Sequence, residues 1–141
     1  MVKISLVKEK TAYQNVKILT SRQAYTVLQP IFQDNLELFE SFYILLLNSS
    51  NHTTGYAHIS TGGIDATFVD VRIVAKYALE SLSTGIIIAH NHPSGNLKPS
   101  EADKKLTHKI KMALRTLDIN LLDHIILSAR GFYSFSDEGL L

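Results

Sequence analysis

The chain has 141 residues, of which 45% are hydrophobic and 19% are charged, a size and composition typical of one globular domain with its own core. It contains no cysteine, which excludes disulfides, thiolate metal ligands and a cysteine nucleophile, and its net charge of +1 provides no global attraction to nucleic acid or anionic membranes. No apolar run approaches the roughly 20 residues that span a bilayer, and the N-terminal sequence MVKISLVKEK is too short in its apolar part for a signal peptide, so we expect a cytoplasmic protein without a membrane partner.

Residues 1–35 are predicted to form a small N-terminal extension, consisting of a strand and a helix packed on the core. Apolar and polar side chains alternate over residues 2–6, as in a strand, and residues 16–19 indicate a second, short strand. Ser21 is a candidate N-cap for a helix that ends near Pro30. The apolar positions of this helix are Ala24, Val27, Leu28 and Ile31.

Residues 36–141 are predicted to form the main domain, in which strands and helices alternate. The expected strands are residues 42–47, 55–61, 86–89, 121–127 and 132–135, and the expected helices are residues 70–82 and a segment that starts at Ser100. The apolar faces of these helices are Val71, Val74, Ala75, Ala78 and Leu82 in the first, and Ala102, Leu106, Ile110, Leu114 and Leu117 in the second. The order β-β-α-β-α-β-β predicts a layered α/β fold, with a mixed β-sheet flanked by helices.

A polar stretch, HNHPSGNLKPSEAD, begins directly after the apolar strand at residues 86–89. His90 and His92 are two positions apart in an extended chain, so both imidazoles can point at one ion. The Pro-Ser-Gly sequence suits a turn, and Asp103 falls in the first turn of the next helix, whose positive end favours an ionised carboxylate. Two imidazole nitrogens and one carboxylate oxygen, with one position left for water, form the layout of a catalytic zinc site.

The same stretch also has a purely structural interpretation. Ser100 and Asp103 have the spacing of a capping box, with Ser100 as the N-cap and Asp103 as the third helical residue. His90 and His92 can then simply form hydrogen bonds within a loop, because histidine pairs at this spacing also occur without a metal. The spacing alone leaves both interpretations open.

The pattern H-N-H-P-S-G-x-x-x-P-S-x-x-D resembles the metal-binding signature of the JAMM metalloproteases, also called JAB or MPN+ proteins. Together with the later LLDHIIL, it is similar to the bacterial RadC-type branch, and the resemblance extends from Leu36 to the C-terminus, including ESFYIL from Glu40 and VDVR from Val69. It implies a zinc-dependent, isopeptidase-like fold similar to the sheet and flanking helices of cytidine deaminase. By this resemblance the zinc ligands are His90, His92 and Asp103, the catalytic glutamate is Glu40, and the motif serine is Ser100.

Amide hydrolysis at such a site requires a carboxylate that is not a metal ligand. Zinc lowers the pKa of a bound water to about 7, and the carboxylate takes the proton of this water and passes it to the leaving amine. Glu40 is the candidate because it starts the strand expected beside residues 86–89, and Glu37 is a rival base. Ser100 can hydrogen-bond the developing oxyanion. We therefore expect a zinc-dependent metallohydrolase, a peptidase or isopeptidase with a protein or peptide substrate, in which Glu40 activates the zinc-bound water.

Other polar residues in the pattern have less specific interpretations. Asp123 and His124 lie in an apolar, strand-like run, and burying them requires hydrogen bonds. We interpret them as a pair that braces the sheet or supports the ligands, rather than as ligands themselves. Arg72 matches an arginine at the start of the family's helix, and it either pairs with a carboxylate or faces the substrate. His52 and His58 carry no supporting pattern.

A cationic face on the last helix supports an alternative function. Lys104, His108, Lys111 and Arg115 are three or four residues apart, which is typical of a solvated face but also suits contacts with phosphates. RadC-type proteins are often called DNA repair proteins, so the alternative is a non-catalytic protein- or DNA-binding module. Full-length members usually carry an N-terminal helix-hairpin-helix region. We expect this region to be absent here, and its absence weakens the DNA alternative. A zinc deaminase is disfavoured because the chain has no Cys-x-x-Cys.

Overall fold

The computed structural model describes residues 1–5, 7–62 and 68–141. Its elements, in chain order, are α1 (Ser21–Phe32), β1 (Ser41–Leu47), β2 (Thr53–Thr61), α2 (Val71–Glu80), β3 (Gly85–Asn91), α3 (Glu101–Arg115), β4 (Asn120–Ser128) and β5 (Gly131–Ser134). The strands form one five-stranded sheet in the order β2-β1-β3-β4-β5, in which β3 and β4 are parallel and the other neighbours are antiparallel. The predicted mixed α/β fold is confirmed.

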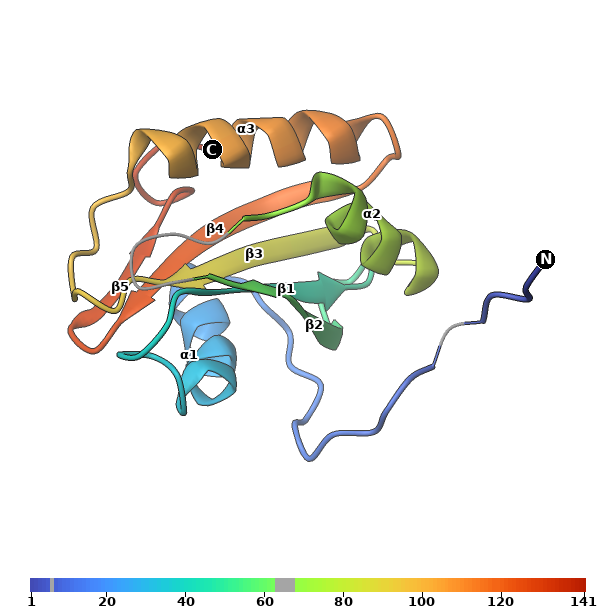
Figure 1. Ribbon diagram of the computed structural model, residues 1–141, viewed down its shortest axis with the longest axis horizontal. Coiled ribbons are helices and arrows are strands. Elements are labelled where there is room, and N and C mark those ends of the chain that lie inside the picture. Colours follow the sequence, from blue (N-terminus) through green and yellow to red (C-terminus); the bar gives the residue numbers. More distant parts are fainter. Residues whose placement is uncertain (6, 63–67) are drawn as a thin grey trace.

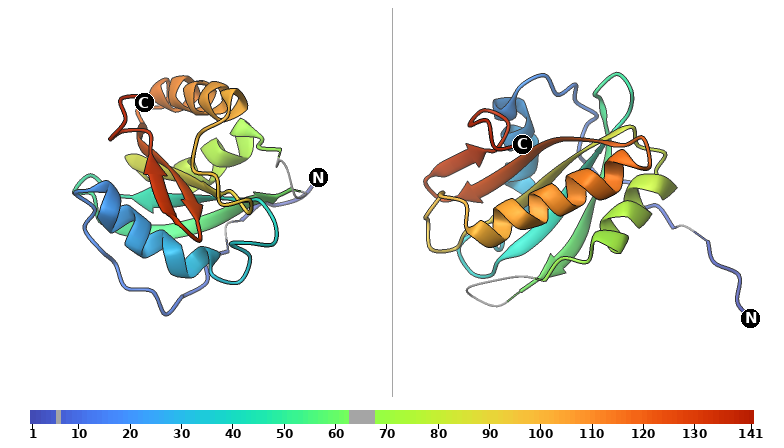
Figure 2. Two further views of the ribbon diagram at one scale, coloured as in Figure 1. Left: turned by 90° about the vertical axis from the view of Figure 1, so that its left-hand side faces the viewer. Right: turned by 90° about the horizontal axis from the view of Figure 1, so that it is seen from above.

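Helices cover both faces of this sheet, with α2 and α3 on one side and α1 on the other (Figure 1). Figure 2 shows the same three layers from two further directions. Side chains of the inner strand β1 alternate between the two layers, because successive residues of a strand point to opposite faces. Phe42, Ile44 and Leu46 join the core beneath α2 and α3, and Leu45 and Leu47 join the core over α1. Within the described segments, no helix is long and apolar enough to span a membrane.

The strand predicted at residues 2–6 is wrong for the part that the structure describes. Residues 2–5 form no strand, and the side chains of Val2 and Ile4 are 83% and 80% exposed, whereas Leu6 lies outside the described residues. In residues 16–19, the described pairing is a single bridge between Lys17 and His52. An alternating pattern gives a strand only where a neighbouring strand accepts and donates the main-chain hydrogen bonds.

The helix predicted for the N-terminal extension exists and packs on the sheet through Ala24, Leu28 and Phe32. Its N-cap is Thr20 rather than Ser21, because the Thr20 hydroxyl accepts from the main-chain N–H of Gln23, whose side chain reaches back to close a capping box. Pro30 lies inside the last turn, and the helix continues to Phe32.

The apolar faces predicted for α2 and α3 are correct except at the C-terminal end of α2 and at both ends of α3. Leu82 lies beyond the end of α2 at φ +54° and is 87% exposed. In α3, Ala102 is exposed, and Leu117 lies beyond the last helical residue and is also exposed. A threonine that the apolar pattern did not include, Thr107, is buried instead.

Candidate metal centre

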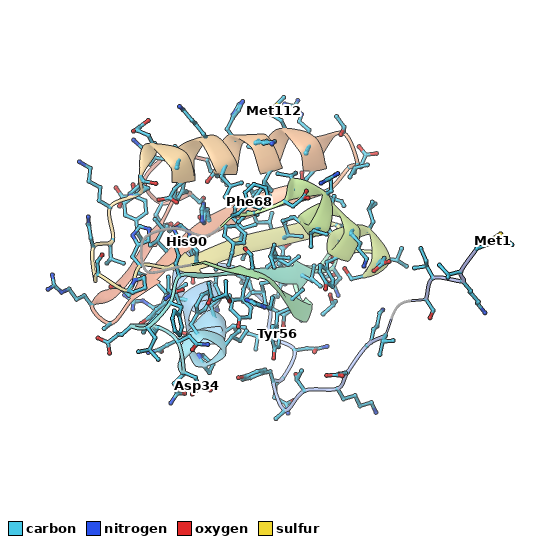
Figure 3. All side chains as sticks on the ribbon, in the orientation of Figure 1. Met1, Asp34, Tyr56, Phe68, His90 and Met112 are labelled. Carbon is cyan, nitrogen blue, oxygen red and sulfur yellow. The ribbon has the colours of Figure 1, made fainter. Side chains whose placement is uncertain are left out.

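Two neighbouring strands and the start of α3 bring the predicted site residues to one end of the sheet. β3 carries His90 beside β1, and Glu40 immediately precedes β1. After β3 the chain turns, and the N–H of Gly95 donates to the carbonyl of His92 at 3.0 Å. α3 follows this turn and carries Asp103 in its first turn. Figure 3 shows His90 at this end of the sheet, beneath the start of α3.

Glu40, His90, His92 and Asp103 each offer one ligand atom, and these four atoms lie within 4.8 Å of one another. The Nε2 atom of His90 lies 2.9 Å from Nε2 of His92 and 3.3 Å from Oδ1 of Asp103. The Nε2 atom of His92 lies 3.6 Å from Oδ2 of Asp103. Atoms that bind a tetrahedral zinc at roughly 2.0–2.2 Å are themselves roughly 3.3–3.6 Å apart. The two distances to Asp103 fall within this range, and the 2.9 Å between the imidazole nitrogens is shorter than it, so a small separation of the two rings would complete the spacing for such an ion.

Glu40 lies slightly farther from the histidines than Asp103 does. Its Oε1 atom is 3.7 Å from Nε2 of His90 and 4.0 Å from Nε2 of His92. Glu40 is buried, at 7% exposure, and its main-chain carbonyl accepts a hydrogen bond from the N–H of Gly62 at 2.8 Å. The rival base Glu37 is exposed and lies outside the group of candidate ligands found among the described residues. The structure thus places Glu40, and not Glu37, at the centre.

The second nitrogen of each histidine is held by a hydrogen bond that orients its ring. Nδ1 of His92 donates to the main-chain carbonyl of Asn96 at 2.5 Å, since a carbonyl oxygen can only accept. Nδ1 of His90 lies 2.7 Å from Nε2 of His124. Both Nε2 atoms therefore face the carboxylates. Histidine ligands of metals in proteins are usually anchored through their second nitrogen in this way.

The charges at the centre perturb one another. Burial lowers the pKa of His90 below its usual value, although the carboxylate of Asp103 opposes this shift. Burial also acts to lower the pKa of His92, but hydrogen bonds to Asp103 and Asn96 outweigh it and raise the pKa above its usual value. Burial acts to raise the pKa of Asp103, but its close contacts with the imidazoles of both histidines hold it well below its usual range. Asp103 is therefore an ionised carboxylate at neutral pH, which suits it to bind a cation.

Ser100 forms the capping box that its spacing with Asp103 predicted. The Ser100 hydroxyl accepts from the N–H of Asp103 at 3.0 Å, and the N–H of Ser100 donates to Oδ2 of Asp103 at 2.7 Å. The same contacts hold the Asp103 carboxylate in place beside the histidines. The structural and the metal-binding interpretations of this stretch are therefore compatible, because one set of hydrogen bonds serves both. The catalytic role of Ser100 stays a prediction.

Asn91, which separates the two histidines, has a role that the sequence analysis missed. Its neighbours on the strand point to one face, so its own side chain points to the other, where it is fully buried. Its Oδ1 accepts from the N–H of Ser41 at 2.8 Å, and its Nδ2 donates to the carbonyls of Leu36 at 2.9 Å and Phe39 at 2.7 Å. Asn91 thus fixes the segment that carries Glu40. The alternation of side chains along the strand was the signal that could have found it.

We expect Asn91→Ala to destabilise the protein and to weaken metal binding at the same time. The change leaves the buried N–H of Ser41 without its partner, at a cost of about 1–3 kcal/mol, and also removes the partner of two part-buried carbonyls. Chemical denaturation and metal titration measure the two effects. Asn48→Ala is the matched control, because Asn48 makes its hydrogen bonds in an exposed turn. Unchanged stability of Asn91→Ala would show that the hydrogen bonds of Asn91 do not stabilise the fold.

Asp123 and His124 do not act as one pair, because their side chains point to opposite faces of β4. The Asp123 carboxylate accepts from the hydroxyl of Ser134 at 2.6 Å and from the N–H of Ser136 at 3.0 Å, and so ties β4 to the C-terminal segment. Burial raises the pKa of Asp123 above its usual value. His124 is fully buried and contacts His90. The expectation that they are not themselves ligands stays a prediction.

Arg72 pairs with a carboxylate, which is the first of its two predicted roles. Its guanidinium donates to both oxygens of Asp70, with a shortest distance of 2.6 Å, and is 90% exposed. Hydrogen bonds from Arg72 lower the pKa of Asp70 to about 2. On α3, Lys104 pairs with Glu101 at 2.7 Å. The other members of the predicted cationic face are His108 and Arg115, which are exposed, and Lys111, which is half-buried. Contact of this face with DNA stays a prediction.

Comparison with known proteins independently supports the resemblance to the RadC-type family. Residues 18–140 match the family model of the RadC-like JAB domain, so the matched region includes α1. A "UPF0758 protein" of Flavobacterium johnsoniae is 49% identical over 124 residues, which cover 88% of this chain and 53% of that protein. A protein of the same designation from Porphyromonas gingivalis is 41% identical over 125 residues, covering 88% and 54%.

A shorter relative matches as well. The "UPF0758 protein YfjY" of Escherichia coli is 42% identical over 102 residues, which cover 72% of this chain and 64% of that protein. The chain spans about half the length of the first two relatives. With a family match over nearly the whole sequence, and with the residues of the JAMM pattern gathered into a group that could hold a metal ion, the chain belongs to the family of RadC-like JAB domains.

Proposed function

We propose that the protein is a zinc-dependent metallohydrolase that cleaves an amide bond in a peptide or an isopeptide-linked protein. The observation that carries this proposal is the convergence of two imidazole nitrogens and two carboxylates within 4.8 Å. Three ligands are enough to hold a catalytic zinc. The fourth group, the carboxylate of Glu40, is then available for the proton transfer that amide hydrolysis requires. Membership of the JAB family, which includes metalloproteases, supports the same reaction class.

The ligand atoms fit zinc by their chemistry as well as by their spacing. A site of two imidazoles and one carboxylate is a common set for catalytic zinc, and the residues that would provide it are His90, His92 and Asp103. When bound, zinc would polarise the scissile carbonyl and lower the pKa of a water to about 7. The hydrogen bonds on the second nitrogens of both histidines would hold the imidazoles in place for this ion.

Glu40 is the residue of this chain that would move the proton. Its carboxylate would accept a proton from the attacking water while the water oxygen bonds to the carbonyl carbon. It would then deliver that proton to the nitrogen as the carbon–nitrogen bond breaks, which gives a carboxylic acid and an amine. Burial of Glu40 keeps water from screening its charge and so strengthens its interactions with the reacting groups.

Ser100 would contribute a hydrogen bond to the substrate oxygen as negative charge develops there. Its hydroxyl accepts the N–H of Asp103, which holds the oxygen in a fixed position. A hydroxyl also carries one proton, which it can donate. Such a donor, held in place before the reaction, stabilises an oxyanion more than a mobile one does.

The experiment is a hydrolysis assay on the purified, zinc-loaded chain. The substrates are linear peptides and peptides joined through a lysine side chain, and the products are separated by mass spectrometry. We expect cleavage that stops when a chelator removes the zinc and returns when zinc is added. If the zinc-loaded chain cleaves none of these substrates, the hydrolase proposal fails and the non-catalytic binding module becomes the better description.

A further inference from the structure

A buried chain of hydrogen bonds leads away from the metal centre, beyond the contact between His90 and His124. It starts at Nδ1 of His90, which lies 2.7 Å from Nε2 of His124. Nδ1 of His124 lies 2.6 Å from the hydroxyl of Thr107, and this hydroxyl lies 2.6 Å from the main-chain carbonyl of Asp103. His90, His124 and Thr107 are each 2% exposed or less. The chain thus joins one candidate ligand to the backbone of another.

The direction of every hydrogen bond in this chain follows from its last member. The carbonyl of Asp103 can only accept, so the Thr107 hydroxyl must donate its single proton to that bond. The hydroxyl can then only accept from His124, which places a proton on Nδ1 of His124. His124 is packed against the rings of Phe42 and Phe135, with centroids 5.9 Å and 4.5 Å away, and apolar surroundings of this kind favour a neutral imidazole.

A neutral His124 with its proton on Nδ1 has a lone pair on Nε2. The neighbouring nitrogen of His90 must therefore donate, which places the proton of His90 on Nδ1. The lone pair of His90 is then on Nε2, which can accept a hydrogen bond from Nε2 of His92 at 2.9 Å and lies 3.3 Å from Oδ1 of Asp103. In the opposite tautomer, Nε2 of His90 would carry a proton and could not bind a metal.

We propose that Thr107 and His124 are positioning residues, which set the tautomer of His90 so that its Nε2 faces the metal centre as a lone pair. With this arrangement, His90 would adopt this tautomer before any metal binds. The consequence for zinc rests on the proposed function, whereas the tautomer itself does not. Thr107 lies four residues after Asp103 in α3, so the same helix would hold the carboxylate and set the nitrogen that faces it.

The direct test is nitrogen NMR of the metal-free protein labelled at histidine, at mildly alkaline pH. We expect both His90 and His124 to carry their proton on Nδ1 in the wild type. In Thr107→Val the hydroxyl is lost and the shape is kept, so His124 loses its acceptor and both rings gain access to the opposite tautomer. A wild-type spectrum with the proton of His90 on Nε2 would overturn the proposal, whatever the stability of the valine variant.

Zinc affinity, measured by competition with a chromophoric chelator, is the second readout. Loss of a residue that supports a metal ligand costs about 10- to 100-fold in metal affinity, and we expect a loss in this range for Thr107→Val. Thr107→Ser keeps the hydroxyl and should retain the affinity. Thr26→Val is the matched control, because Thr26 in α1 makes the same bond to the carbonyl four residues earlier and is exposed. Equal zinc affinity in Thr107→Val and the wild type would contradict the proposal.

The two readouts separate this inference from the proposed function. A wild-type protein with the expected tautomers that binds no zinc would support the hydrogen-bond directions and overturn the zinc hydrolase. A wild-type protein that binds zinc while His90 carries its proton on Nε2 in the metal-free state would overturn the tautomer assignment and leave the zinc site supported.

Discussion

His92→Ala should lose zinc binding while the protein stays folded. His92 would provide one of three ligands, and removal of its imidazole leaves a carboxylate and one nitrogen, which cannot complete a catalytic zinc site. His92 lies just after the last residue of β3 and belongs to neither hydrophobic core cluster of the described residues, so its loss leaves the apolar core unchanged. The zinc content after dialysis against trace chelator is measured by mass spectrometry, and circular dichroism reports on the fold.

The matched control for this variant is His58→Ala. His58 lies on the edge strand β2, hydrogen-bonds Thr61 at 2.8 Å and is not a member of the metal-ligand group. We expect it to keep the zinc content of the wild type. Full zinc occupancy in His92→Ala would remove His92 from the ligand set and leave the two histidines as a structural pair.

Glu40→Gln should keep the zinc and lose hydrolysis. Glutamine has nearly the same size as glutamate but cannot accept a proton from water, and general acid–base catalysis by one side chain contributes typically about 10²- to 10⁴-fold. We therefore expect hydrolysis to fall by about this factor once a cleaved substrate is available. The rate is measured at saturating zinc, with the zinc content of each sample determined in parallel.

Glu37→Gln tests the alternative base, because Glu37 lies three residues earlier and is exposed. It should hydrolyse the substrate at the wild-type rate. The opposite result, in which Glu37→Gln is inactive and Glu40→Gln is active, would assign proton transfer to Glu37. Loss of zinc in Glu40→Gln would indicate instead that Glu40 is a fourth ligand.

The arrangement of the centre followed from local rules and strand order. The two-residue spacing of His90 and His92 on an extended chain predicts that they point to the same side. The expectation that the strand after Glu40 neighbours β3 is confirmed, since β1 and β3 pair directly. The capping-box spacing of Ser100 and Asp103 predicted the local geometry at the start of α3.

The supporting residues could not be predicted in the same way, because their roles depend on contacts between distant segments. Asn91 contacts residues 50 or more positions earlier, which become neighbours only in the folded sheet. Thr107 breaks the apolar pattern of α3, and its partner His124 is 17 positions away. Residues 2–5 alternate as a strand would but form none, because an alternating pattern produces a strand only where a neighbouring strand is present.

X-ray absorption spectroscopy at the zinc edge of the purified, zinc-loaded wild-type chain tests the metal centre most directly. We expect about one zinc per chain, bound by nitrogen and oxygen atoms at roughly 2.0–2.2 Å with the outer-shell scattering of two imidazoles. Failure to retain zinc, or a spectrum with water ligands and no imidazole scattering, would contradict a zinc site formed by His90, His92 and Asp103.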